Sequence, residues 1–168
     1  VFSPDEEERE VARFTFPRQP RRDRLCLADY FLPLSTGRRD VAVFQIVTVG
    51  SEATALTERL QANGDYSESF FSHGLSVQTA EGLADYAHAR IRTELGAGRE
   101  QGKRYSWGYP ACPDLGQHAL VDRLLDAGAA GIRITDGFQF DPEQSTAALV
   151  VLHPDARYYA LARSGGDG

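Results

Sequence analysis

A nearly continuous apolar run at residues 41–49 predicts a buried strand. It reads Val-Ala-Val-Phe-Gln-Ile-Val-Thr-Val, and most of its side chains are β-branched. Gly50 ends the run, and Ser51 is of a residue type that caps helices. Apolar residues then recur at helical spacing and predict a helix that stops at Asn63-Gly64; they are Ala53, Leu56 and Leu60.

Helical periodicity returns twice before the middle of the chain. A second helix is expected to begin at Asp65, because Glu68 stands at the spacing of a capping box. The clearest helix is predicted over residues 77–95, and Gly96 ends it. One face of that helix is apolar and consists of Ala80, Leu83, Ala84, Ala87, Ile91 and Leu95.

The rest of the chain predicts one more helix and then strands. Asp114 caps a helix whose apolar positions are Leu120, Val121, Leu124 and Leu125, and Gly128 closes it. Gly and Pro turns separate three β-rich runs, at residues 131–135, 146–152 and 158–162. One strand, then helices, then consecutive strands indicate an α+β fold with a largely antiparallel sheet.

The first 24 residues are expected to be a linker or arm, and residues 25–168 the folded domain. The arm is charged and weakly periodic, with Phe14 and Phe16 as possible anchors onto the domain. Its basic cluster, residues 18–24, has the composition of a solvated linker. The chain begins at Val1 and contains no methionine, so we expect a piece of a longer protein.

Composition narrows the class of protein. A length of 168 residues favours one domain, and a net charge of −6 argues against nucleic-acid binding. No apolar run approaches the roughly 18 residues that span a bilayer, and the charged start is unlike a signal peptide. Cys26 and Cys112 are too few for a disulfide scaffold, so we expect reduced thiols in a cytoplasmic protein.

Several common kinds of site are missing from the sequence. None of the four histidines stands in a metal-binding spacing, so no metal site is expected. The chain has neither a dinucleotide-binding fingerprint nor a nucleophile elbow. Cys112, between two prolines, is interpreted as a packing residue, because no base stands near it in the sequence.

The stretch from Arg104 to Asp114 is the strongest candidate for a binding site. It reads Arg-Tyr-Ser-Trp-Gly-Tyr-Pro-Ala-Cys-Pro-Asp, a rigid aromatic loop with a single arginine. Arg104 could grip a ligand carboxylate, although it could equally be a surface arginine. Asp40 is either a turn residue or an acceptor for a ligand ammonium. Taken by themselves, these residues indicate a binding site for a small ligand, and they do not indicate a particular chemical reaction.

Other carboxylates and tyrosines allow the same two interpretations. Glu81 near the start of the predicted helix fits the helix dipole as well as a site. Tyr158 and Tyr159 are adjacent on a predicted strand, so one is expected in the core and the other free for a ligand.

We call the stretch at residues 104–114 the signature. It closely resembles the signature of the C-terminal activation domain of cobalamin-dependent methionine synthase, which binds S-adenosylmethionine (AdoMet). The pattern Arg-x-x-x-Gly-Tyr-Pro-Ala-Cys-Pro-Asp matches without a gap. The likeness covers the chain from about Cys26 and extends over four further motifs: 26–31, 86–92, 142–146 and 153–159.

This resemblance implies a C-shaped single α+β domain with a twisted, largely antiparallel sheet flanked by helices. It implies AdoMet binding by Asp40, Arg104, Gly108, Tyr109, Tyr158 and Tyr159, with Glu81 near the methyl-transfer face. The implied role is reductive methylation of inactive cobalamin, so the domain would be part of a methyltransferase and not catalytic alone. The cobalamin-binding domain of the same enzyme and flavodoxin, or a similar reductase, are the implied partners.

One absence limits what this chain could do by itself. The family's cobalamin domain carries Asp-x-His-x-x-Gly, and no histidine here has an aspartate two residues before it. Cobalamin would therefore be held by another domain. A rival interpretation remains: a stand-alone AdoMet-binding module that activates a separate corrinoid protein or senses AdoMet.

Overall fold

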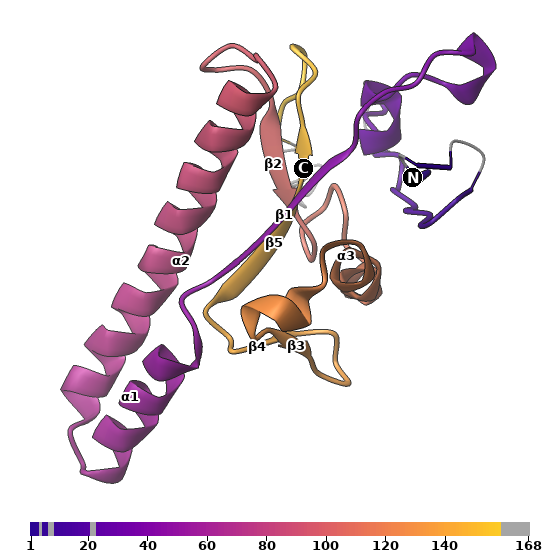
Figure 1. Cartoon of the computed structure of the whole chain (residues 1–168). Coiled ribbons are helices and arrows are strands. Elements are labelled where there is room, and N and C mark those ends of the chain that lie inside the picture. Colours follow the sequence, from indigo (N-terminus) through magenta and orange to yellow (C-terminus); the bar gives the residue numbers. More distant parts are fainter. Residues whose placement is uncertain (4, 7–8, 21–22, 159–168) are drawn as a thin grey trace, which may run out of the picture.

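An antiparallel sheet with helices on both sides forms the molecule (Figure 1). The computed structural model describes residues 1–3, 5–6, 9–20 and 23–158. The central strand β5 (Ser145–Val151) pairs with β1 (Val43–Thr48) on one side and with β2 (Lys103–Ser106) on the other. A small second sheet consists of β3 (Arg133–Ile134) and β4 (Phe140–Asp141). The α+β, antiparallel prediction is confirmed.

Helices α1 (Ser51–Ala62) and α2 (Tyr66–Glu94) form an antiparallel hairpin on one side of the sheet. The short helix α3 (His118–Leu125) and the second sheet lie on the other side. Within the described residues, four 3₁₀ turns connect these elements: η1 (Leu27–Tyr30), η2 (Leu34–Thr36), η3 (Leu115–Gln117) and η4 (Ala127–Ala130).

Helix α2 corrects the prediction of two separate helices, since residues 66–94 form one continuous helix. Its length is roughly 44 Å at 1.5 Å per residue. The predicted apolar face is also wrong in part, because Leu83 and Leu95 are 38% and 49% exposed. The buried positions combine two of the predicted alanines with three polar side chains: Ser69, Ser76, Ala80, Ala84 and His88. Small side chains allow the helix backbone to approach the sheet closely.

The predicted helix ends are correct to within a few residues, but their capping differs. Gly50, not Ser51, is the N-cap of α1. Asp65 precedes α2 as predicted, yet its side chain makes no capping hydrogen bond. Asp114 does cap, accepting from the Gly116 amide at 2.9 Å at the start of η3. Helix α3 ends at Asp126, in the left-handed region with φ 52°, and not at Gly128.

The strand predictions have mixed outcomes. Strand β1 lies within the predicted run, and β5 corresponds to the run at 146–152. The run at 131–135 is a strand only at residues 133–134. Strand β2 was not predicted. The strand expected at 158–162 lies outside the described residues except for Tyr158, which is not in a strand.

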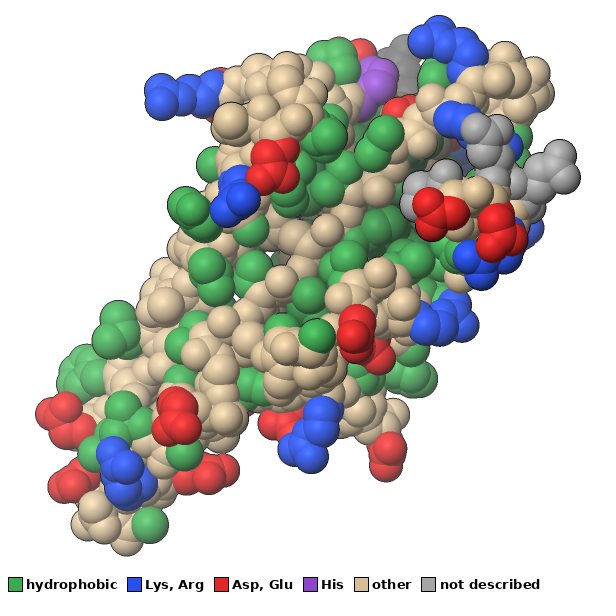
Figure 2. Space-filling model, in the orientation of Figure 1, with side chains coloured by type: hydrophobic (Ala, Val, Ile, Leu, Met, Phe, Trp, Pro, Cys, Tyr) green, Lys and Arg blue, Asp and Glu red, His purple; other side chains and the backbone are tan. Residues whose placement is uncertain are grey.

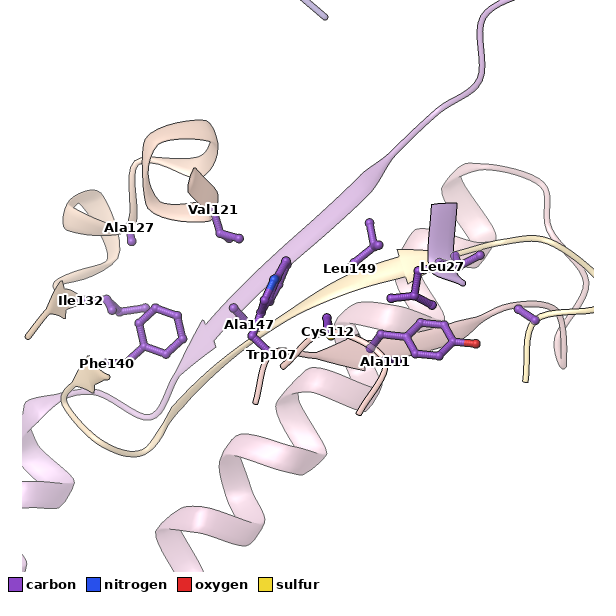
Figure 3. Close-up of a cluster of buried hydrophobic side chains, with 13 residues drawn as sticks. Leu27, Trp107, Ala111, Cys112, Val121, Ala127, Ile132, Phe140, Ala147 and Leu149 are labelled. Atoms are coloured by element: carbon purple, nitrogen blue, oxygen red, sulfur yellow. The ribbon is translucent and has the colours of Figure 1, made fainter. Parts of the chain in front are cut away.

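The main core lies between the sheet and α3, where Trp107, Val121 and Leu149 are buried together (Figure 3). Phe14 and Phe16 pack against this core as partly buried side chains, so the predicted anchors do contact the domain. The Phe14 ring stacks on Phe44 with 4.9 Å between centroids. The boundary between an arm and a domain at residue 24 stays a prediction.

Exposed apolar side chains gather on the α1–α2 hairpin, at the lower left of Figure 2. On α2, Tyr66, Phe70, Phe71 and Leu75 are each at least 68% exposed. Even so, within the described ranges no helix combines the length and hydropathy needed to cross a membrane.

Candidate functional site

A cavity of about 460 Å³ lies where α2, β2, the signature loop and the start of β5 meet. This volume is within the range of small-molecule sites. The lining combines aromatic, apolar and polar side chains, among them Glu81, Arg104, Ser106, Tyr109, Leu115, His118, Phe140, Thr146 and Tyr158. The structure therefore brings together four of the residues that the sequence analysis singled out: Glu81, Arg104, Tyr109 and Tyr158.

Arg104 is held at one end of this cavity by two carboxylates of α2. Its Nη2 donates to Asp85 Oδ1 at 2.9 Å and to Glu81 Oε2 at 3.3 Å. Only 14% of the arginine side chain is exposed. Glu81 and Asp85 are four residues apart on a helix, so they project from the same side. Among the described residues, the partners of the guanidinium are these carboxylates and not the signature aromatics.

The position of Glu81 excludes one of its two interpretations, while its role toward a ligand stays a prediction. Because α2 begins at Tyr66, Glu81 lies in the middle of the helix and not in its first turn. The helix dipole acts within the first and last turns, so it does not account for this carboxylate. The contact with Arg104 and the cavity does.

Gly108 shapes the loop that forms another wall of the cavity. It has φ 88°, a conformation that favours glycine. Its amide donates to the Cys112 carbonyl oxygen at 3.0 Å, and the Cys112 amide donates to the Tyr109 carbonyl oxygen at 2.9 Å. This tight turn leaves Tyr109 67% exposed at the cavity. Gly108 itself is beside the lining.

Cys112 closes the turn from the inside. It is 1% exposed, and its Sγ donates to the Ser106 carbonyl oxygen at 3.0 Å. Burial raises the pKa of this thiol to about 12. A thiol with so high a pKa is a poor nucleophile at neutral pH, which agrees with the packing role. Cys26 and Cys112 are both free thiols.

Trp107 and His118 connect the cavity to the core. Trp107 is 4% exposed and donates from Nε1 to Gln117 Oε1 at 3.3 Å. The His118 ring lies edge-on to the indole with 5.8 Å between centroids, and its Nδ1 is 2.7 Å from the Phe138 carbonyl oxygen. Burial lowers the pKa of His118, so the ring is neutral at physiological pH. Periodicity gave no signal for His118 as a cavity residue.

Tyr158 covers the Arg104 end of the cavity. It is 64% exposed, and its ring lies edge-on to the buried Tyr105 with 5.8 Å between centroids. Tyr159 lies outside the described residues.

Asp40 does not line this cavity. Its carboxylate accepts from the Val41 amide at 2.8 Å and from the Leu32 amide at 3.1 Å. Both bonds stabilise the turn before β1, as expected if Asp40 is a turn residue. A contact between Asp40 and a ligand ammonium stays a prediction that this geometry does not favour.

The sequence analysis missed Asp85, which contacts Arg104 but does not line the cavity. A signal was present, because Asp85 stands four residues after Glu81 within the helix and therefore shares its face. Ser106 was also missed, although it follows Arg104 by two residues and so shares its side of a strand.

The described residues hold no cluster of three His, Cys, Asp or Glu that could bind a metal ion. Among the described residues, Cys112 is buried and does not line the cavity, and the lining His118 bonds a carbonyl group, so these two do not form a nucleophile–base pair there. The described lining offers Arg104, the carboxylate of Glu81 and aromatic walls, and a second carboxylate, Asp85, pairs with the arginine from outside the lining. Such a set suits binding and orienting a small zwitterionic ligand.

Comparisons with known proteins agree on one family. The family model described as "Vitamin B12 dependent methionine synthase, activation domain" matches residues 1–168. The methionine synthase of Mycobacterium tuberculosis is 36% identical over 88% of this chain, and that of Mycobacterium leprae is 37% identical over 93%. The chain spans only 14% and 15% of their lengths.

A solved structure extends the likeness to three dimensions. The crystal structure of the MetH reactivation domain bound to AdoHcy matches with a TM-score of 0.76 and 30% sequence identity. The match covers 82% of this chain and 47% of that one.

Proposed function

This chain belongs to the activation domain family of vitamin B12 dependent methionine synthases, and on that premise we propose that its cavity binds AdoMet. The observation that carries the proposal is the grouping of Arg104, Tyr109 and Tyr158 around one cavity of suitable size. The similar reactivation domain holds AdoHcy, which is AdoMet without its transferable methyl group.

We assign roles to the cavity residues from their contacts. Both hydrogen bonds of the Arg104 guanidinium to described residues use Nη2, so Nε and Nη1 can still bind the methionyl carboxylate. The backbone at Gly108 and the rings of Tyr109 and Tyr158 would contact the rest of the ligand. Tyr159 is proposed as a neighbour on the strength of the family resemblance alone.

The proposed reaction step places demands that these residues can meet. Transfer of a methyl group from a sulfonium to cobalt needs in-line placement and exclusion of water, but no general base. This chain would supply the placement, and a one-electron reductant would supply the electron that inactive cobalamin needs. The cavity with its fixed arginine and aromatic walls is suited to that task.

Cobalamin itself is assigned to another domain of the same enzyme. The four histidines have other surroundings: His73 contacts Glu143, His88 and His118 are buried, and His153 lies against Tyr30. The partners proposed are therefore the cobalamin-binding domain and flavodoxin or a similar reductase. The free thiols fit a cytoplasmic location.

The alternative is a stand-alone AdoMet-binding module that activates a separate corrinoid protein or senses AdoMet. The relatives favour the first proposal, because in them the matching segment is part of a much longer methionine synthase.

Calorimetric titration with AdoMet tests the binding proposal. Wild-type chain should release heat and gain thermal stability on binding, because a ligand that binds only the folded state raises its melting temperature. Arg90→Ala is the control for Arg104→Ala. Arg90 also contacts a carboxylate of α2 but lies outside the cavity lining, so its variant should bind like the wild type. A folded wild-type chain that gives neither signal at millimolar AdoMet would refute the proposal.

A further inference from the structure

Arg104, Glu81 and Asp85 form a cluster beside the cavity with a net negative formal charge, and Asp85 reaches Arg104 from outside the cavity lining. One guanidinium contacts two carboxylates there, Glu81 at 3.3 Å and Asp85 at 2.9 Å. One positive and two negative groups leave a formal charge of −1 for the described residues of this cluster. Of the two carboxylates, Asp85 is the one that the sequence motifs did not single out.

This charge has a consequence for which ligand binds. AdoMet carries a carboxylate, an ammonium and a positively charged sulfonium, whereas AdoHcy has a neutral thioether in place of the sulfonium. If the ligand carboxylate binds Nε and Nη1 of Arg104, only a short saturated chain separates the sulfur from that point. The sulfur then lies within the field of the acidic pair, which salt screens only beyond about 8 Å.

We propose that Asp85, acting with Glu81, is a specificity-determining residue that makes the cavity prefer the cationic sulfonium ligand over the neutral thioether. This inference rests on the proposed function, since it concerns the same cavity and the same ligand class. The preference would help the domain release AdoHcy after the methyl group has left, and so allow a new AdoMet to enter.

Geometry makes Asp85 the better residue to test than Glu81. Its contact with Arg104 is the shorter, while its side chain is 75% exposed, so substitution leaves no buried group unpaired. Asp85→Asn keeps the shape and an oxygen that accepts from Nη2, and removes only the negative charge. Glu94→Gln is the control, because it removes a carboxylate charge from the same helix that pairs with Arg90 and not with Arg104.

The experiment measures dissociation constants for AdoMet and AdoHcy by calorimetry on wild type, Asp85→Asn and Glu94→Gln. Wild type and Glu94→Gln should favour AdoMet. In Asp85→Asn the ratio of the two affinities should fall by about fivefold, a size set by a single, largely solvated charge. AdoHcy binding should stay equal or become tighter.

The outcomes separate the two proposals. If wild type binds neither ligand, the proposed function itself fails. If wild type binds both but Asp85→Asn leaves the affinity ratio unchanged, only the specificity role of Asp85 is overturned. A second measurement guards against a misfolded variant: the wild-type ratio should shrink as salt rises from 50 to 500 mM, and a salt-independent ratio would also count against the role.

Discussion

Gln45 Nε2 donates a hydrogen bond to the Ala84 carbonyl oxygen over 3.1 Å and so joins the middle of β1 to α2. Ala84 is the neighbour of Asp85, which contacts Arg104. The bond therefore fixes the position of α2, with its carboxylates Glu81 and Asp85, along the sheet that carries Arg104. The other amide atom, Gln45 Oε1, is buried and has no hydrogen-bond partner.

Two substitutions of Gln45 should test how its hydrogen bond and its unpartnered oxygen affect stability. Gln45→Met removes one buried hydrogen bond and one unpartnered oxygen together, so the free energy of unfolding should change by less than about 1 kcal/mol. Gln45→Glu places an acceptor against the Ala84 carbonyl oxygen and should cost about 2 kcal/mol or more. Urea unfolding measures both, and equal losses in the two variants would contradict this account.

His88 should make the fold sensitive to acid. Burial, and next the positive charge of Arg92, lower its pKa from 6.5 to about 4, and its Nε2 has no partner. Because this pKa lies below the unfolded value, the unfolded chain binds more protons between these limits, and stability falls as the pH falls from 6.5 toward 4. His118 contributes in the same direction.

A His88→Gln variant tests whether His88 causes this loss of stability in acid. Its free energy of unfolding should depend less steeply on pH between 4 and 6.5 than that of the wild type, because one of two buried histidines no longer titrates. Urea unfolding at several pH values gives the slope. A slope identical to the wild type would mean that the pKa of His88 is the same in the folded and unfolded states.

Gly102 should be irreplaceable at the start of β2. Its φ is +83°, and a Cβ there would lie 2.6 Å from the Val151 carbonyl oxygen, which belongs to the backbone of β5. Gly102→Ala should therefore lower the free energy of unfolding by at least about 2 kcal/mol and displace the strand that carries Arg104.

Gly74 provides the opposite control. It lies within α2, and a Cβ there would meet no atom within 4 Å. Gly74→Ala should raise the free energy of unfolding by about 0.5–1 kcal/mol, the helix preference for alanine over glycine. Thermal and urea unfolding of both variants check the contrast. Similar effects of the same sign would show that the β2–β5 contact is not the cause.

The Cys112 thiol should be inert. Its pKa of about 12 keeps it protonated at neutral pH, so the folded chain should react with a thiol reagent only as fast as it opens. Cys112→Ala should remain folded, at a cost of about 1 kcal/mol, and retain AdoMet binding. Rapid labelling of the native protein, or loss of binding with intact secondary structure, would overturn the packing role.

Local signals predicted the elements that depend on local chemistry. The apolar run of β1, the spacing of α1 and the Asp114 cap could each be seen in the sequence. Strand β2 could not, because Lys103–Ser106 has no apolar pattern and is a strand only through pairing with β5. The long α2 was divided because the buried positions of its first half, Ser69 and Ser76, are polar, so hydrophobic periodicity does not recognise them.

The site was predictable in part for the same reason. Arg104 and Tyr109 stood out as members of one rigid motif, and the structure places both on the cavity. Asp85 and His118 come from α2 and α3, so only the tertiary fold brings them to the motif. Asp40 had the right chemistry for a ligand, but its turn uses both carboxylate oxygens locally.

The last prediction is that this chain methylates cobalamin only in the presence of its partners. Under the proposed function the cavity would hold AdoMet, and its described residues offer no nucleophile with a base, so the acceptor would have to be brought by a second module. A cobalamin-loaded domain, AdoMet and a flavodoxin or chemical reductant should together give methylcobalamin, followed by its visible spectrum. Under the proposed function docking should be transient, because the same cobalamin would also have to reach the other substrates of a methionine synthase.

Variants of this chain make that mixing experiment decisive. Arg104→Ala removes the charged partner of the ligand carboxylate, which typically costs about 2–4 kcal/mol, so methylation at limiting AdoMet should slow at least tenfold. Arg90→Ala, outside the cavity lining, should leave the rate unchanged. Because AdoMet is present in every mixture, a rate that is equal without this chain would show that the chain does not present the methyl group. The AdoMet-sensing alternative would then be favoured.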